Sequence, residues 1–238
     1  MKIVKKQRIT AYYEEEGKYL KSSDIDRYYR GMFRIVSTSG CRNRIIEKWL
    51  DSAHPSESFL DIGCELGYYV RKMAKKGLKA TGVDISPTKI RKAKVVAAQS
   101  NINCKFYIQD AENLEFEDNS FDWVLCTETL EHLLKDQRAA QELVRVAKKF
   151  IIISVPQKSV FWRFINLLAP VYGFNKRGAG HLREYTTESL LRLFGDSVQV
   201  QVLEKAGFFI SFLDRFVPNL SIFKAVICLK FKKKMAKI

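Results

Sequence analysis

The sequence predicts an α/β protein with a doubly wound, mostly parallel sheet of seven strands. The first observation behind this prediction is that, from residue 58 onward, short apolar runs alternate with amphipathic segments of helical spacing. The second is that the 238 residues, 47% of them hydrophobic, match the size of one hydrophobic core. The third is a turn with two glycines directly after the first apolar run, where open parallel sheets bind ligands.

Five buried strands are expected, and each has the length and apolar content of a strand inside a sheet. They are SFLDI (58–62), KATGVDI (79–85), NCKFYIQ (103–109), FDWVLC (121–126) and FIIISV (150–155). Helices are predicted between them, at residues 68–77, 87–99 and 136–149. Strands joined by crossover helices form a parallel sheet with helices on both faces.

The segments on either side of these strands have weaker patterns. Residues 1–56 are polar and aromatic, and they predict helices that lead into the core domain, residues 57–238, or cover it as a lid. Two last strands are expected near residues 207–213 and 221–231, while VQVQV at 198–202 also alternates as a strand does.

A long aromatic and basic insertion, residues 156–186, follows the fifth strand. We expect it over the active face, because loops of this length in compact domains usually carry function. Its mixture of aromatic and basic side chains suits contact with an anionic membrane surface or with a lipid-linked acceptor. The same mixture also suits a simple cover for the core.

Charge and composition limit the partners and the compartment. The chain has 41 Lys and Arg against 26 Asp and Glu, and its net charge of +15 either attracts phosphates or anionic lipid or reflects only a lysine-rich enzyme surface. Its five cysteines lack metal-ligand spacing and are predicted to be reduced thiols. Because it has no apolar run of about 18 residues and no cleavable leader, we expect it in the cytoplasm, with peripheral membrane contact as an addition.

The turn DIGCELG carries the features of a cofactor site. Gly63 and Gly67 permit a tight bend and close approach of a ligand to the backbone. Asp84 ends the second strand roughly twenty residues later, where a carboxylate can accept both hydroxyls of a ribose. Glu65 stands where a dinucleotide motif has its middle glycine, and its charge would repel a pyrophosphate. A cationic, ribose-bearing cofactor such as S-adenosylmethionine (SAM) is therefore favoured.

Over residues 58–155 the chain resembles the class I SAM-dependent methyltransferases, in the type 11 group that includes ubiquinone and menaquinone biosynthesis enzymes. LDIGC resembles the first motif of this family, TGVDIS the second, QDAENLEF the third and FDWVLCTETLEHL the fourth. The chain departs from the family at Glu65, where glycine is common in the group.

The resemblance implies SAM as the cofactor, and it assigns Asp84 to the ribose, Asp110 to the adenine amino group and the backbone around Ala111 to the adenine ring. The predicted cofactor-binding residues are Asp61, Gly63, Cys64, Glu65, Gly67, Asp84, Ile85, Asp110, Ala111 and Thr127. Two alternatives stay open, namely that Asp110 only forms a turn and that Asp122, which opens the fourth strand, is only a surface residue.

The candidate catalytic residues are Glu128, Glu131, His132 and His181. The first three follow the fourth strand, and on a helix their spacing would put them on one face, as acid and base or as substrate contacts. The Glu-x-x-Glu-His pattern also resembles a segment that holds a divalent cation in ubiquinone-type O-methyltransferases, although the three side chains could instead pair with Lys135 and Arg138. We assign no metal from the sequence.

His181 lies in GHLREYT, which resembles the segment after the fifth strand in small-molecule and polysaccharide-cluster members of the group. That resemblance puts His181, Arg183 and Tyr185 at the acceptor pocket, with a purely structural role as the alternative. The predicted function is methyl transfer from SAM to a small-molecule, lipophilic or glycan-linked acceptor, at oxygen. An RNA (tRNA) methyltransferase and a non-catalytic SAM-binding protein are the other candidates; nucleic acid is the less favoured partner, and the oligomeric state is not predicted.

Overall fold

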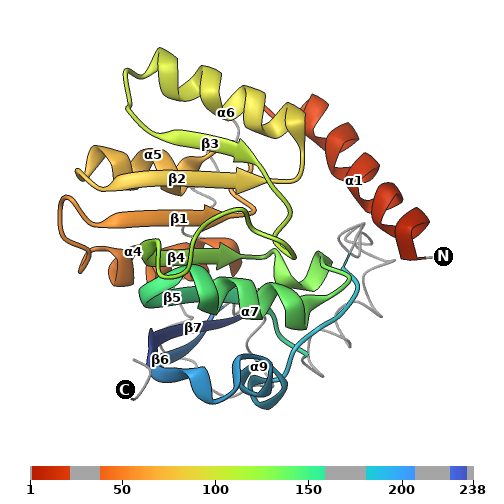
Figure 1. Ribbon diagram of the computed structural model, residues 1–238, viewed down its shortest axis with the longest axis vertical. Helices are drawn as coiled ribbons and strands as arrows, with labels where there is room; N and C mark the ends of the chain where they lie inside the picture. The colour runs from red at the N-terminus through yellow and green to blue at the C-terminus, as the bar shows by residue number, and fades with distance from the viewer. Residues whose placement is uncertain (1, 22–37, 159–180, 207–225, 235–238) are drawn as a thin grey trace.

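The computed structural model describes residues 2–21, 38–158, 181–206 and 226–234, and its centre is a sheet of seven strands in the order β3-β2-β1-β4-β5-β7-β6 (Figure 1). The strands are β1 (Ser58–Ile62), β2 (Lys79–Asp84), β3 (Lys105–Ile108), β4 (Phe121–Thr127), β5 (Ala147–Pro156), β6 (Val198–Ala206) and β7 (Val226–Lys233). Strands β1 to β5 pair in parallel, and β7 is antiparallel to both β5 and β6. The predicted doubly wound fold and its first five strands are confirmed.

The last two strands differ from the prediction. The alternating VQVQV segment begins β6, which is an edge strand, but its valines do not share one buried face: Val198 is buried, Val200 is 41% exposed, and the register with β7 shifts between Val200 and Val202. The strand predicted at 207–213 lies outside the described residues, and β7 overlaps the one predicted at 221–231. Most of the insertion predicted at 156–186 also lies outside the described residues.

The helices cover both faces of the sheet (Figure 1). They are α1 (Lys2–Tyr19), α4 (Thr38–Leu50), α5 (Tyr68–Lys75), α6 (Pro87–Gln99), α7 (Asp136–Val146) and α9 (Thr187–Phe194), with the 3₁₀ turns η1 (Leu130–His132) and η3 (Gly195–Ser197). One apolar cluster joins α4, α5 and α6 to the sheet, and a second joins α7 and α9 to the opposite face. Along β1 the side chains alternate accordingly, so that Phe59 enters the first cluster and Leu60 the second.

The start of α6 and the end of α7 each have a physical cause. Pro87 is the first residue of α6, and the Ser86 side chain before it caps the helix by accepting from the Lys89 backbone N–H. Helix α7 ends at Val146, three residues earlier than predicted, because the chain enters β5 at Ala147 and pairs there with Phe121 of β4. The two basic residues after Val146 therefore belong to β5, whose partly exposed start tolerates charged side chains.

Helix α1 runs beside α6 at the carboxyl ends of the strands (Figure 1). The Glu14 carboxylate accepts hydrogen bonds from the Ser86 hydroxyl at 2.6 Å and from the Thr88 backbone N–H at 3.0 Å. These bonds lower the pKa of Glu14 to about 2. In return, the Lys92 ammonium donates to the carbonyl of Gly17 at the end of α1, at 2.7 Å. Each helix thus satisfies free backbone groups at the end of the other.

No helix in the described parts of the chain combines the length and the apolar character that crossing a bilayer requires. The five cysteines are free thiols, as predicted.

The burial of α7 against the sheet gives a stability prediction. Leu143 is 0% exposed in the second cluster, so Leu143→Ala is expected to lower the free energy of unfolding by about 2–5 kcal/mol through lost burial and a cavity. Val95→Ala, at a position of α6 that is 50% exposed, serves as the control and should change it by about 0.5 kcal/mol or less. Urea unfolding of both variants makes the comparison, and equal effects would contradict the described packing.

Candidate cofactor and acceptor site

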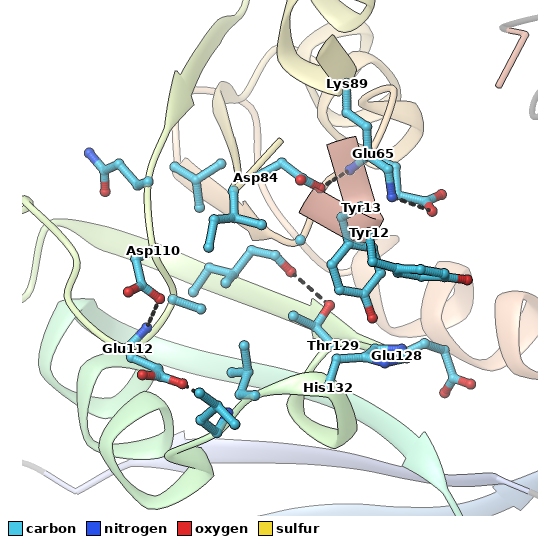
Figure 2. Close-up of a pocket in the computed structure, with 18 of the residues that line it drawn as sticks. Tyr12, Tyr13, Glu65, Asp84, Lys89, Asp110, Glu112, Glu128, Thr129 and His132 are labelled. Atoms are coloured by element: carbon cyan, nitrogen blue, oxygen red, sulfur yellow. Dashed lines mark hydrogen bonds and ion pairs between the residues drawn. The ribbon is translucent and has the colours of Figure 1, made fainter. Parts of the chain in front are cut away.

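A cavity of about 350 Å³ opens at the carboxyl ends of the strands, and α1 forms one of its walls (Figure 2). The loops after β1, β2, β3 and β4 supply the other walls. The predicted site residues that line it are Gly63, Glu65, Asp84, Ile85, Asp110, Ala111, Glu128, His132 and His181. Residues from four separate loops are therefore brought together as the sequence predicted, because parallel strands end at one edge of the sheet.

The turn after β1 requires both of its glycines. Gly63 has a φ of +74°, and a Cβ at this position would collide with the side chain of Thr129. Gly67 has a φ of +72°, and a Cβ there would collide with the ring of Phe106. Glu65, between them, also has a positive φ of 48°, which is uncommon for a residue with a side chain. The turn therefore holds a strained residue at the cavity wall.

Asp84 ties this turn to α6. Its carboxylate accepts hydrogen bonds from the backbone N–H of Glu65 at 3.0 Å and of Ser86 at 2.9 Å. Asp84 is 7% exposed, and its burial raises the pKa of its carboxyl, although the nearby Lys89 ammonium acts in the opposite direction. Asp61 does not line the cavity but lies 3% exposed beneath the turn, where burial and then the charge of Asp84 raise its pKa well above the ordinary value.

Lys89 is a buried cation beside the ribose-binding candidate, and the sequence did not identify it. Its ammonium lies 2.7 Å from the Glu16 carboxylate, 3.6 Å from that of Glu65 and 4.9 Å from the centre of the Tyr13 ring. The side chain is only 3% exposed, so these two acids compensate its charge. The ion pair of Glu65 and Lys89 links the turn after β1 to α6 (Figure 2).

The wall opposite Lys89 is built around Asp110 and Glu112. Asp110 accepts from the Glu112 backbone N–H at 3.0 Å, so it does form a turn, and it also lines the cavity. The Lys6 ammonium of α1 binds both carboxylates, Asp110 at short range and Glu112 at 2.9 Å. Glu112 in turn accepts from the backbone N–H groups of Leu134 and Lys135 at 2.9 and 3.0 Å, which fixes the loop after η1.

The predicted helix carrying Glu128, Glu131 and His132 on one face is wrong. Glu128 has a φ of +49° and precedes η1, which contains only Leu130–His132. The Glu128 carboxylate lies 3.4 Å from the Arg42 guanidinium and 3.1 Å from the Ser154 hydroxyl, rather than pairing with Lys135 or Arg138. The backbone leaves helical geometry here because Glu128 still pairs with β5 through its N–H, which donates to the Ser154 carbonyl.

Glu131 and the two histidines form a cluster at this end of the cavity. Glu131 is 0% exposed, and neither carboxylate oxygen has a hydrogen-bond partner among the described residues. Burial, followed by the neighbouring Glu128 carboxylate, raises the pKa of Glu131 well above its ordinary value. His132 Nε2 lies 3.9 Å from the Glu131 carboxylate, and the His132 ring is 4.8 Å from the His181 ring.

Several predicted residues support the site without lining the cavity. Cys64 is buried, with its sulfur directed at Gly82 of β2, and Gly67 packs against Phe106. Thr127 ends β4, and its carbonyl accepts from the Thr129 hydroxyl at 3.0 Å. Their roles in cofactor binding remain predictions.

Asp122 lies at the amino end of β4, away from the cavity. It accepts from the Ser58 N–H at 3.0 Å and pairs with Lys149 at 3.1 Å. Arg183 pairs with Asp136, and the Tyr185 hydroxyl donates to the same carboxylate at 3.0 Å. The contacts of Arg183 and Tyr185 with Asp136 fasten the segment that carries His181, and the predicted place of both residues at the acceptor pocket remains a prediction.

The cavity is acidic although the protein is basic overall. Its described lining contains the carboxylates of Glu16, Glu65, Asp84, Asp110, Glu112 and Glu128, and the ammonium groups of Lys6 and Lys89. An excess of carboxylates in a partly enclosed cavity favours a cationic ligand and disfavours a phosphate. The sequence missed the α1 residues because they come from a separate segment whose position depends on packing against α6.

The chain is similar in sequence to known methyltransferases. The model of the family described as "Methyltransferase domain" matches residues 60–152. The chain is 37% identical over 100 residues to 2-methyl-6-phytyl-1,4-hydroquinone methyltransferase of Synechocystis sp., covering 42% of this chain and 31% of the relative. It is 32% identical over 159 residues to ubiquinone biosynthesis O-methyltransferase of Coxiella burnetii, covering 62% of this chain and 65% of the relative.

A solved structure has the same fold over most of the chain. Magnesium protoporphyrin IX methyltransferase (ChlM) from Synechocystis, with bound SAH (S-adenosylhomocysteine), superimposes with a TM-score of 0.67 at 18% identity, covering 91% of this chain and 97% of that chain. The α/β fold and its order of strands are those of class I SAM-dependent methyltransferases. The methyltransferase-domain family model matches residues 60–152, and the resemblance found in the sequence is confirmed.

The first prediction for this site concerns Asp84. Asp84→Asn keeps the side-chain shape but removes the charge that the ribose hydroxyls and two backbone N–H groups require, so SAM affinity is expected to fall at least tenfold. Isothermal titration calorimetry measures the affinity. Asp196→Asn, at an exposed position of η3, is the matched control and should bind as the wild type does; an unchanged affinity for Asp84→Asn would reject this assignment.

The second prediction concerns pH. Because the pKa values of Asp61 and Asp84 are raised, the folded protein holds protons on these carboxyls at pH values where the unfolded chain has lost them. The free energy of unfolding of the ligand-free protein is therefore expected to decrease as the pH rises above the ordinary carboxyl pKa of about 4. A cationic ligand favours the ionised carboxylates, so SAM should bind more tightly as pH rises and should release protons.

Calorimetry in two buffers of different ionisation enthalpy measures this proton release. SAH lacks the sulfonium charge and is expected to release fewer protons than SAM. Equal, pH-independent binding of the two ligands would contradict the proposed electrostatics of the cavity.

Proposed function

We propose that the chain is a SAM-dependent methyltransferase that acts on an oxygen atom of a small lipophilic acceptor. The observation that carries this proposal is one cavity whose lining joins the cofactor-binding candidates Gly63 and Asp84 to His132 and His181, with the buried Glu131 clustered behind the two histidines. A methyl donor and an acceptor must lie in line, and a continuous cavity permits that alignment.

The residues present fit SAM. The Asp84 carboxylate lines the cavity, which supports its proposed contact with the ribose hydroxyls, and the Glu65 carboxylate, 44% exposed at the turn, suits the ammonium group of the methionine end. SAM supplies an activated methyl group when bound. The protein's own contribution is to orient the acceptor, to exclude water with the rings of Tyr12 and Tyr13, and to take up the acceptor proton at His132.

The charge of the cavity supports a neutral acceptor. A phosphate or a carboxylate would meet the six carboxylates of the lining, whereas a phenolic or enolic hydroxyl carries no charge before it loses its proton. The two curated relatives are named for a hydroquinone and for ubiquinone biosynthesis, which are consistent with such an acceptor. The net charge of +15 keeps RNA as the second candidate substrate, and salt-dependent retention of tRNA would favour it.

Binding of a metal cation is a second proposed role for the acceptor end of the cavity. Among the described residues, Glu131, His132 and His181 form a candidate metal site. Their ligand atoms all lie within 4.8 Å of one another. Carboxylate and imidazole ligands suit a divalent transition metal, which would lower the pKa of an acceptor hydroxyl. Loss of activity in EDTA with recovery in Mn²⁺ or Mg²⁺ would favour this role; activity that is indifferent to EDTA would favour His132 as the proton acceptor.

The proposed function is tested with purified protein, SAM and a panel of phenols and quinols, by measuring SAH formation. His132→Asn is expected to lower kcat about a hundredfold, because general base catalysis contributes roughly that factor, while the Kd of SAH changes less than twofold. His54→Asn is the control, since His54 is exposed and lies on the loop before β1. Tight SAM binding by the wild type without turnover of any acceptor would support a non-catalytic SAM-binding protein instead.

A further inference from the structure

Tyr13 of α1 has a buried hydroxyl group that makes no hydrogen bond to the described part of the chain. The hydroxyl oxygen is buried and has no hydrogen-bond partner among the described residues, and the side chain lines the cavity. A buried hydroxyl without a partner is unfavourable, and phenylalanine would fill the same space without that cost. The hydroxyl is therefore expected to bond to something that enters the cavity.

The position of the Tyr13 ring indicates which part of a ligand it meets. The ring edge contacts His132, with ring centres 5.4 Å apart at an angle of 78°, and His132 contacts His181. The other side of the ring faces the Lys89 ammonium at 4.9 Å. Figure 2 shows Tyr12 and Tyr13 between the pair of Glu65 and Lys89 and the side chain of His132. Tyr13 thus stands at the boundary between the cofactor half and the acceptor half of the cavity.

The backbone that carries Tyr13 is firmly placed. Its neighbour Glu14 binds the first turn of α6 through Ser86 and Thr88, and Glu16 binds the buried Lys89. Contacts on the residues that flank Tyr13 fix the direction of its side chain, because α1 can neither rotate nor slide without breaking them. A side chain held in this way can position a ligand with little loss of conformational entropy.

We propose that Tyr13 is an acceptor-binding residue, whose hydroxyl donates a hydrogen bond to the acceptor oxygen beside His132. This inference rests on the proposed function, because it takes the acceptor to be a phenolic or enolic oxygen. The hydrogen bond strengthens when the acceptor oxygen loses its proton and becomes an anion. Helix α1 then has a role in recognising the acceptor as well as in closing the cofactor site.

The test compares the wild type with Tyr13→Phe, which removes only the hydroxyl. The probe is 4-nitrocatechol, whose absorbance reports binding to the SAH complex without any turnover. Tyr13→Phe is expected to weaken 4-nitrocatechol binding about tenfold, because it removes a hydrogen bond to the phenolic oxygen of the probe. The Kd of SAH, measured by calorimetry, should change less than twofold.

Tyr19→Phe is the matched control, since it removes the same group from the same helix at a side chain that is 76% exposed. This variant should bind both ligands as the wild type does. Equal 4-nitrocatechol binding by wild type and Tyr13→Phe would overturn the proposal. So would a parallel loss of SAH affinity, which would make Tyr13 a cofactor contact.

The failure of this inference can be distinguished from a failure of the proposed function. If the wild-type SAH complex binds 4-nitrocatechol through Tyr13 but no phenol is methylated, the contact stands and the proposed reaction is wrong. If the wild-type complex does not bind 4-nitrocatechol, the proposed contact is rejected even where methylation of another acceptor is found. Thermal unfolding of both variants verifies that each is folded.

Discussion

The site depends on the two hydrogen bonds that the Asp84 carboxylate accepts from backbone N–H groups. One comes from Glu65 in the glycine turn and the other from Ser86 at the start of α6, so a single side chain joins the loops after β1 and β2. Hydrogen bonds to a charged acceptor are stronger than neutral ones, and the burial of Asp84 shields them from water. The same carboxylate lines the cavity, so the group that shapes the site is also exposed to any ligand that enters it.

Helix α1 completes this arrangement through charged and polar contacts. Lys6 binds Asp110 and Glu112, Glu14 binds the first turn of α6, and Glu16 binds Lys89. The ion pairs of Lys6, whose side chain is 37% exposed, are individually weak and are screened by salt, whereas Glu14 at the N-terminus of α6 gains from the free N–H groups there. The wall formed by α1 is thus attached at several points, and its separation from α6 would break polar contacts more than it would expose a hydrophobic core.

The electrostatics of the cavity are opposite in sign to those of the whole chain. A protein of net charge +15 places six carboxylates around one cavity, which requires that the cations be directed elsewhere or be paired within it. Lys6 and Lys89 fill the second role, since each bridges two acids. Without them, the burial of several like charges would oppose folding of the loops. With them, the cavity keeps an acidic character suited to a sulfonium cofactor.

The parallel strands, the glycine turn and the positions of Asp84 and Asp110 at the sheet edge could be predicted from the sequence alone. These features follow from local patterns, because apolar runs, a pair of glycines and an aspartate at the end of a strand can each be interpreted from a few neighbouring residues. The sequence also placed Glu128, Glu131 and His132 near one another, but the helix assumed for them was wrong because pairing with β5 imposed a non-helical backbone at Glu128.

The identity of the side chains that close the cavity depends on tertiary packing. Lys6 and Tyr13 come from a segment distant in the chain, and nothing local in their residue pattern specifies that α1 packs beside α6. Lys89 has an ordinary place in an amphipathic helix, and its burial depends on acids supplied by α1 and by the turn after β1. Contacts between distant segments depend on the summed packing of the whole fold, and short-range periodicity carries no information about them.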